Sequence, residues 1–194
     1  GEGDRLVRSG SWKGWNPMQM LGTHVTGSTL GVIGMGRIGK AIARRCNLGF
    51  DMPVYYYNRS KVTDLKLKNC YQVDSLDELF GKADVIVIAV PGGPETYHLI
   101  DKKAFAKMKS SSILINIARG EIIKESDLID ALQKKEIGGV GLDVYEFEPL
   151  ISPQLVDLEN AVLLPHLGTA ALSVREEMGL IALKNIIDIL LEKK

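Results

Sequence analysis

Residues 29–48 read TLGVIGMGRIGKAIARRCNL, and this segment is the strongest indication of the fold. It begins with an apolar run typical of a buried strand and ends in the Ala-rich, helix-like segment 40–48. A strand, a glycine turn and a helix in this order form a dinucleotide-binding fingerprint, whereas the glycine spacing alone would be a weak signal. We expect Gly34 to permit the tight turn, Gly36 to let backbone approach a pyrophosphate, and Gly39 to let helix and strand pack closely.

Strand-like and helix-like patterns alternate along the rest of the chain. This alternation predicts an α/β fold, a Rossmann-type doubly wound parallel sheet with helices on both faces. One domain is expected over 1–194, with 1–27 as a lead-in. The expected strands are 29–33, 53–57, 71–73, 84–90, 113–117, 140–144 and 161–164. The expected helices are 40–48, one capped by Ser75, 102–109, 126–135 and 169–191, the last broken near Gly179, and 145–160 is expected to be a long loop.

Composition narrows the classes of function. Lys+Arg and Asp+Glu are both 24, so the formal net charge is zero and no global basic field favours nucleic acid or an anionic membrane as a partner. The longest apolar runs have the length of strands, so no membrane span is expected. Cys46 and Cys70 lack metal-ligand spacing. We expect no metal site and interpret the two cysteines as reduced thiols of a cytoplasmic protein.

The turn after the second expected strand bears on which dinucleotide is bound. An acidic residue about 20 positions beyond the glycines usually binds the ribose 2′-hydroxyl of NAD. Asn58 occupies that place here, and Arg59, Ser60 and Lys61 follow it with groups that can donate to a 2′-phosphate. We therefore expect NADP(H) to be preferred and NAD(H) to be the alternative cofactor. The competing interpretation is a solvated basic turn, with the cofactor preference set elsewhere.

Two further strand ends carry side chains suited to redox chemistry at a carbon beside a carboxylate. Arg119 follows a buried strand, where a guanidinium fork can bind a substrate carboxylate through two hydrogen bonds. His166 follows the last strand, and an imidazole, which titrates near neutral pH, can exchange a proton with a carbonyl or hydroxyl oxygen.

A carboxylate can orient such a histidine and stabilise its charged form. Glu148 precedes Pro149, which favours an extended backbone that would direct Glu148 at His166. Glu146 competes for this role but lacks the proline neighbour. The other two histidines, His24 and His98, are not accompanied in the sequence by such an arginine and glutamate, and we expect them to be structural.

These residues, in this order, resemble the NAD(P)-binding domain of the D-isomer-specific 2-hydroxyacid dehydrogenase family. The similarity runs from about Trp12 to Leu191, and the segments LGVIGMGRIG (30–39) and LDVYEFEPL (142–150) match the family closely. Within the family, the chain is most similar to glyoxylate/hydroxypyruvate reductases, including enzymes that reduce 2-ketogluconate. The resemblance implies hydride transfer from a nicotinamide cofactor to glyoxylate, hydroxypyruvate or a sugar ketoacid.

The resemblance also implies roles for individual residues. Arg119 would bind the substrate carboxylate, His166 would be the acid/base, and Glu148 would be its partner. Asp143 would contact the nicotinamide amide. The remaining residues implied to bind the cofactor are Arg37, Ile38, Thr96, Ala118 and Gly168.

The chain departs from the family pattern in two places. Family members often read Leu-Thr-Pro-x-Thr where this chain has PGGPET (91–96), and the effect of Gly92-Gly93 stays open. Asn58 replaces the acid of NAD-dependent members, which makes an NAD-dependent enzyme such as phosphoglycerate dehydrogenase the less favoured alternative. A dinucleotide-sensing, corepressor-like binding module is a second alternative, because it would keep the glycines and the Arg, Glu and His.

Members of the family also have a second, substrate-binding domain, which we expect to be absent from this fragment. The segment 12–21 resembles one that packs across a homodimer interface in relatives, so a homodimer is expected. The chain by itself is expected to bind nucleotide and to catalyse poorly or not at all.

Overall fold

The computed structural model describes residues 1–63 and 65–192. Its strands form one sheet in the order β3-β2-β1-β4-β5-β6-β7, and all neighbouring pairs are parallel. The strands are β1 (Leu30–Ile33), β2 (Val54–Tyr57), β3 (Cys70–Gln72), β4 (Val85–Ile88), β5 (Ile113–Asn116), β6 (Gly139–Leu142) and β7 (Ala161–Leu163). The predicted parallel sheet is confirmed. Lys193 and Lys194, the end of the expected domain, lie outside the described residues.

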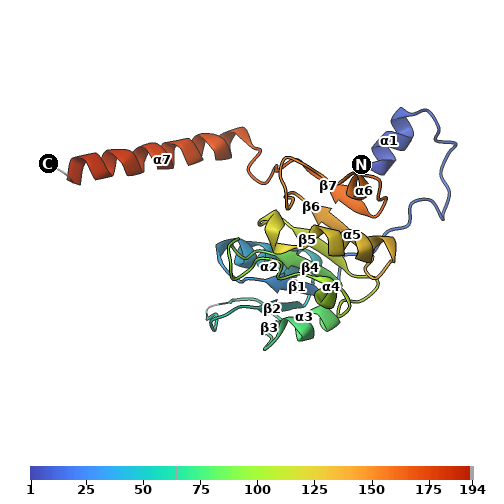
Figure 1. Cartoon of the computed structure of the whole chain (residues 1–194), viewed down its shortest axis with the longest axis horizontal. Helices are drawn as coiled ribbons and strands as arrows, with labels where there is room; N and C mark the ends of the chain where they lie inside the picture. The colour runs from blue at the N-terminus through green and yellow to red at the C-terminus, as the bar shows by residue number, and fades with distance from the viewer. Residues whose placement is uncertain (64, 193–194) are drawn as a thin grey trace.

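The order of the strands creates a crevice at one edge of the sheet. From β1 the chain moves outward through β2 to β3, then crosses back to β4 and continues outward through β7 on the other side (Figure 1). Ile33, at the end of β1, is in register with Tyr57 of β2 and Ile88 of β4. The direction of winding therefore reverses between β1 and β4, and open α/β sheets bind ligands beyond the carboxyl ends of the strands at such a point.

Helices cover both faces of the sheet, as expected. The larger core cluster joins Ile33 and other strand residues to α3 (Leu76–Lys82), α4 (Lys102–Phe105) and α5 (Glu125–Gln133), through side chains such as Phe80, Phe105 and Leu128. The smaller cluster lies on the opposite face and joins Val32 to α2 (Arg37–Phe50). The helices are α1 (Glu2–Arg8), α2 (Arg37–Phe50), α3 (Leu76–Lys82), α4 (Lys102–Phe105), α5 (Glu125–Gln133), α6 (Pro153–Val156) and α7 (Leu172–Glu192), with a 3₁₀ turn at Gly120–Ile122.

Three local predictions are corrected. The α-helix expected over 102–109 ends at Phe105, because the next turn is closed by the tighter Lys107 N to Ala104 O and Met108 N to Phe105 O hydrogen bonds. The loop expected over 145–160 contains α6, which starts with Pro153 at a position that tolerates proline. The break expected near Gly179 does not occur, since α7 is continuous and a glycine inside a helix lowers its stability without ending it.

The two terminal segments lie outside the layered body of the domain. Figure 1 shows α7 extending away from the sheet beyond β7, and α1 standing apart from it at the other end of the chain. Leu172 and Leu180 of α7 are 78% and 66% exposed, as are many other apolar side chains of this helix. None of the described helices is long and apolar enough to cross a membrane.

Candidate active site

The glycine turn joins β1 to α2 and opens a backbone surface toward the crevice. Gly34 has φ of 93°, a conformation that side chains other than glycine rarely adopt, and its N–H donates to the Tyr57 carbonyl at 2.9 Å. A Cβ added to Gly39 would lie 2.1 Å from the Gly34 carbonyl oxygen, whereas one added to Gly36 would meet nothing within 4 Å. The fold itself therefore requires Gly39, and the space at Gly36 is open to a ligand.

The N-terminus of α2 is available to an anion. The helix starts at Arg37, and its N-cap, Gly36, has no side chain to accept from the first N–H groups. Such groups, together with the positive end of the helix dipole, bind phosphate well. The open backbone and the free helix start thus fit the pyrophosphate of a dinucleotide.

Asn58 connects the turn after β2 to the glycine turn. Its Oδ1 accepts a hydrogen bond from the Met35 N–H at 3.1 Å, and its Nδ2 donates to the Ser60 carbonyl at 2.9 Å. The neighbouring Arg59 forms an ion pair with Glu95, a residue that sequence reasoning did not select. The Arg59 and Glu95 side chains are 77% and 75% exposed, so the pair lies in solvent at the rim of the crevice.

A cleft of about 560 Å³ lies between this turn and the PGGPET segment. Its volume is in the range of small-molecule sites. Thr96 lines the cleft, and its Oγ1 donates to the Pro91 carbonyl at 2.8 Å, which folds the segment back on itself. The predicted cofactor residues that line the cleft are Gly34, Gly36, Asn58, Arg59, Ser60 and Thr96. An adjoining hollow is lined by three further predicted cofactor residues, Arg37, Ile38 and Ala118, and by Arg119, the predicted binder of the substrate carboxylate.

The close packing of the PGGPET segment explains why glycines occupy positions 92 and 93. A Cβ on Gly92 would lie 2.6 Å from Glu121 Oε1 and 2.9 Å from Arg119 Cγ. Gly93 has φ of 129°, and its N–H donates to Glu121 Oε1 at 2.8 Å. The departure from the family pattern therefore lets this segment lie directly against the turn that carries Arg119.

Two members of the predicted catalytic trio are in contact, and the third lies near them. His166 Nδ1 is 3.0 Å from Glu148 Oε2, so Nε2 is the nitrogen left to exchange a proton with a ligand. The hydrogen bond with His166 lowers the pKa of Glu148, helped by the Tyr145 N–H and the charge of Arg119 and opposed by partial burial. The Arg119 side chain is exposed at the end of β5, and its Nη1 donates to the Ala118 carbonyl at 2.6 Å.

Asp143 holds the segment that carries His166. It is 8% exposed at the end of β6, and its Oδ1 accepts a hydrogen bond from the Leu167 N–H at 2.6 Å. A Cβ on Gly168 would lie 3.4 Å from Asp143 Oδ2, so this glycine is next to the carboxylate. His166 itself has φ of 55°, an unusual conformation that such contacts stabilise. A contact from Asp143 or Gly168 to a nicotinamide stays a prediction.

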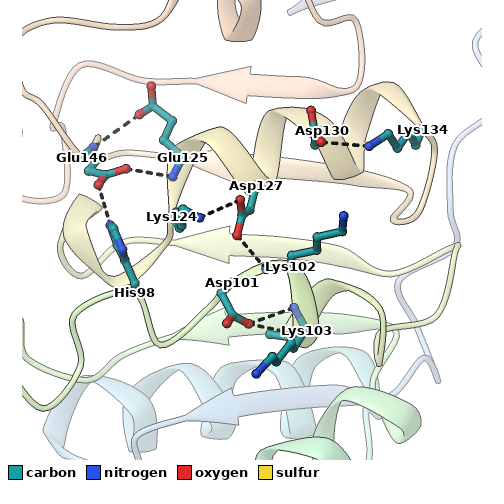
Figure 2. Close-up of polar contacts among 11 residues, drawn as sticks. His98, Asp101, Lys102, Lys103, Lys124, Glu125, Asp127, Asp130, Lys134 and Glu146 are labelled. Atoms are coloured by element: carbon teal, nitrogen blue, oxygen red, sulfur yellow. Dashed lines mark hydrogen bonds and ion pairs between the residues drawn. The ribbon is translucent and has the colours of Figure 1, made fainter.

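A second histidine–carboxylate pair was missed. His98 was expected to lack an acidic partner, but its Nε2 lies 2.6 Å from Glu146 Oε1 (Figure 2). The other Glu146 oxygen accepts from the Glu125 N–H at 2.8 Å, and burial raises the pKa of the Glu125 carboxyl. Glu146 is therefore engaged away from His166, and Glu148 is the residue that contacts it. His98 and Glu146 are 48 positions apart in the sequence, so no local pattern indicated this pair.

Comparison with known proteins identifies close relatives. Residues 1–168 match the model of the D-isomer specific 2-hydroxyacid dehydrogenase, NAD binding domain. A glyoxylate reductase of Pyrococcus horikoshii is 44% identical over 190 residues, covering 96% of this chain and 57% of the relative. A Dictyostelium discoideum protein named "Probable 2-ketogluconate reductase" is 42% identical, covering 96% of this chain and 56% of the relative.

A solved structure shares the fold closely. The NADPH-dependent glyoxylate/hydroxypyruvate reductase of Sinorhizobium meliloti, in complex with NADP and malonate, superposes with a TM-score of 0.82. It is 32% identical, and the match covers 90% of this chain and 53% of that chain. The chain thus spans little more than half the length of the relatives it matches.

Proposed function

The chain belongs to the D-isomer-specific 2-hydroxyacid dehydrogenase family, and we propose that it is the cofactor-binding domain of an NADP(H)-dependent 2-ketoacid reductase. The observation that carries this proposal is the contact between His166 Nδ1 and Glu148 Oε2 at the carboxyl edge of the sheet. Arg119 lies three residues after β5 at the same edge, and the open glycine turn lies beyond β1. The groups that we propose as proton donor, carboxylate binder and nucleotide cradle thus lie on one side of one domain.

The residues of the trio divide the work of reducing a 2-ketoacid. The cofactor, when bound, supplies the hydride that reaches C2 of the substrate. Arg119 binds the substrate carboxylate and orients the neighbouring carbonyl. His166 gives the proton on Nε2 to the carbonyl oxygen, so that the product is the 2-hydroxyacid, and Glu148 keeps Nδ1 protonated and stabilises the imidazolium. Small ketoacids fit this scheme, namely glyoxylate, hydroxypyruvate or a sugar ketoacid.

The preference for NADP(H) follows from the turn after β2. Asn58 brings no negative charge to the place where an acid usually binds the ribose of NAD. Arg59, Ser60 and Lys61 offer donors to a 2′-phosphate, and Arg59 and Ser60 line the cleft. The ion pair with Glu95 is exposed, and an exposed pair contributes only about 0–1 kcal/mol, so it does not prevent Arg59 from binding a phosphate.

Calorimetric titration of this chain with NADPH and NADH in one buffer tests the cofactor proposal. We expect NADPH to bind about tenfold more tightly, and Arg59→Ala to remove most of that difference while leaving NADH affinity unchanged. Equal or tighter binding of NADH would contradict the proposal. It would favour the NAD-dependent dehydrogenases or a dinucleotide-sensing module instead.

The proposal includes a second domain and a second subunit. We propose that this domain works together with a substrate-binding domain, and the match to only 57% of its glyoxylate reductase relative supports this. Apolar side chains on the segment 12–21 suit a homodimer interface, since Trp12, Trp15 and Met18 are 51%, 81% and 74% exposed. Sedimentation equilibrium of this chain should report a dimer, and a monomer at high micromolar concentration would contradict the interface.

We also propose a cytoplasmic location, because we interpret Cys46 and Cys70 as reduced thiols.

A further inference from the structure

Tyr145 lies among the three segments that carry Arg119, Glu148 and His166. It lies three residues after the end of β6, is 7% exposed, and belongs to the larger core cluster. A buried aromatic residue can serve packing alone. Its hydroxyl, N–H and carbonyl groups, however, make contacts that packing alone does not require. Each of these groups contacts a residue or segment that belongs to a different member of the trio.

The hydroxyl of Tyr145 holds the segment that carries His166. Tyr145 Oη donates a hydrogen bond to the Leu164 carbonyl at 2.9 Å, two residues before His166. Burial raises the pKa of the Tyr145 hydroxyl, so the group stays protonated and keeps its role as donor at neutral pH. Three residues later, the Leu167 N–H donates to Asp143. The segment is therefore fixed on both sides of His166, which has the unusual φ of 55°.

The backbone of Tyr145 holds the other two members. Its N–H donates to Glu148 Oε1 at 3.0 Å, while Glu148 Oε2 faces His166, so both oxygens of this carboxylate are engaged. On the other side, a Cβ added to Gly120 would lie 1.9 Å from the Tyr145 carbonyl carbon and oxygen. The backbone next to Arg119 thus lies directly against the backbone of Tyr145, and a shift of one would displace the other.

We propose that Tyr145 is a positioning residue that holds the segments of Arg119, Glu148 and His166 in register for proton transfer. This proposal rests on the function assigned above to these three residues. Tyr145 does not touch the reacting atoms; it acts through the Leu164 carbonyl and the Glu148 carboxylate. A substitution that preserves the loop conformation leaves the backbone contacts of Tyr145 in place. A conservative variant therefore tests the contribution of the hydroxyl alone.

Tyr145→Phe removes the hydroxyl and keeps the ring in the core. In a protein that carries this domain together with a substrate-binding domain, we expect kcat for ketoacid reduction to fall about fivefold with the KM for NADPH unchanged. In a Glu148→Gln background the same substitution should change kcat by less than twofold, because both residues act through His166. Tyr71→Phe is the matched control: its hydroxyl bonds to Asn69 Oδ1 in the exposed strand β3, and kcat should not change.

A second measurement needs no turnover and uses this chain. Hydrogen exchange of the Leu167 amide should be at least threefold faster in Tyr145→Phe, while the amides of β5 exchange at the rate of the original protein. An unchanged kcat, or an unchanged Leu167 exchange rate, would show that Tyr145 is a packing residue and overturn the proposal. If the two-domain protein reduced no ketoacid at all, the proposed function would fail, and the exchange rate alone would decide the positioning role.

Discussion

The three glycines at the start of α2 and inside it should respond very differently to alanine. At Gly39 the added Cβ would lie 2.1 Å from the Gly34 carbonyl oxygen, a backbone atom that cannot rotate away. Overpacking of this kind costs up to about 3 kcal/mol. Replacing glycine inside a helix returns about 1 kcal/mol of helix propensity, so the expected net loss of stability is about 2 kcal/mol. For a chain of this size that corresponds to a melting temperature lower by about 4–8 °C.

Gly36 and Gly49 have open space where a Cβ would be added. Gly36→Ala should lower the melting temperature little, because φ of −76° suits any residue and only an N-cap preference of less than about 1 kcal/mol is lost. It should nevertheless abolish stabilisation by NADPH, since the methyl group would fill the space that we assign to the pyrophosphate. Gly49→Ala, an exposed position in α2, should stabilise by up to about 1 kcal/mol and leave the NADPH response intact.

Thermal unfolding of the three variants, each with and without NADPH, separates packing from binding. We expect a clearly lower melting temperature without ligand for Gly39→Ala alone, and no ligand-induced rise for Gly36→Ala. A Gly36→Ala protein that NADPH stabilises as much as the original would refute the assignment of the open space to the pyrophosphate. A Gly39→Ala protein as stable as the original would refute the packing argument.

Two further predictions concern charged groups at the site. Glu95→Gln removes the negative charge beside Arg59. NADPH should then bind about 1.5- to 5-fold more tightly, the equivalent of about 0.2–1 kcal/mol for an exposed ion pair, and NADH affinity should not change. Calorimetry in low salt measures both affinities, and weaker NADPH binding would contradict the role of Arg59. Because His166 lowers the pKa of Glu148 in the folded chain, the stabilising effect of this carboxylate is complete above its ordinary pKa of about 4.3 and is lost as the pH falls through the lowered value. Urea unfolding of the original protein and Glu148→Gln should therefore differ most above about pH 5 and converge in acid, and a difference that grows on acidification would contradict the contact.

Local patterns predicted the frame of this site well. The apolar run before Gly34 and the glycine spacing predicted β1, the turn and α2, because the signals for the strand and for the helix start both lie in consecutive residues. The parallel sheet then placed the residues that follow β5, β6 and β7 at one edge. That is why Arg119 and His166 could be selected before their positions in space were known, whereas Asp143 was expected only from the resemblance to the family. Their chemical roles remain predictions.

The contacts between loops could not be predicted in the same way. Arg59 and Glu95 are 36 residues apart, and their pairing depends on how PGGPET folds back over the cleft. The Tyr145 hydroxyl reaches Leu164 only because a loop of the observed shape follows β6. Such contacts depend on the conformation of two loops at once, and the sequence of either loop has no periodicity from which that conformation could be predicted.

The proposed function depends on the claim that His166 donates the proton in the reduction of a 2-ketoacid. NADPH oxidation by the two-domain protein can be measured with glyoxylate, hydroxypyruvate and 2-ketogluconate, with and without His166→Gln. We predict turnover of at least one of these ketoacids, and a fall in kcat of about 10²–10⁴-fold in the variant while its NADPH affinity is unchanged. Turnover that survives in His166→Gln, or its absence in the original protein with all three ketoacids, would contradict the claim.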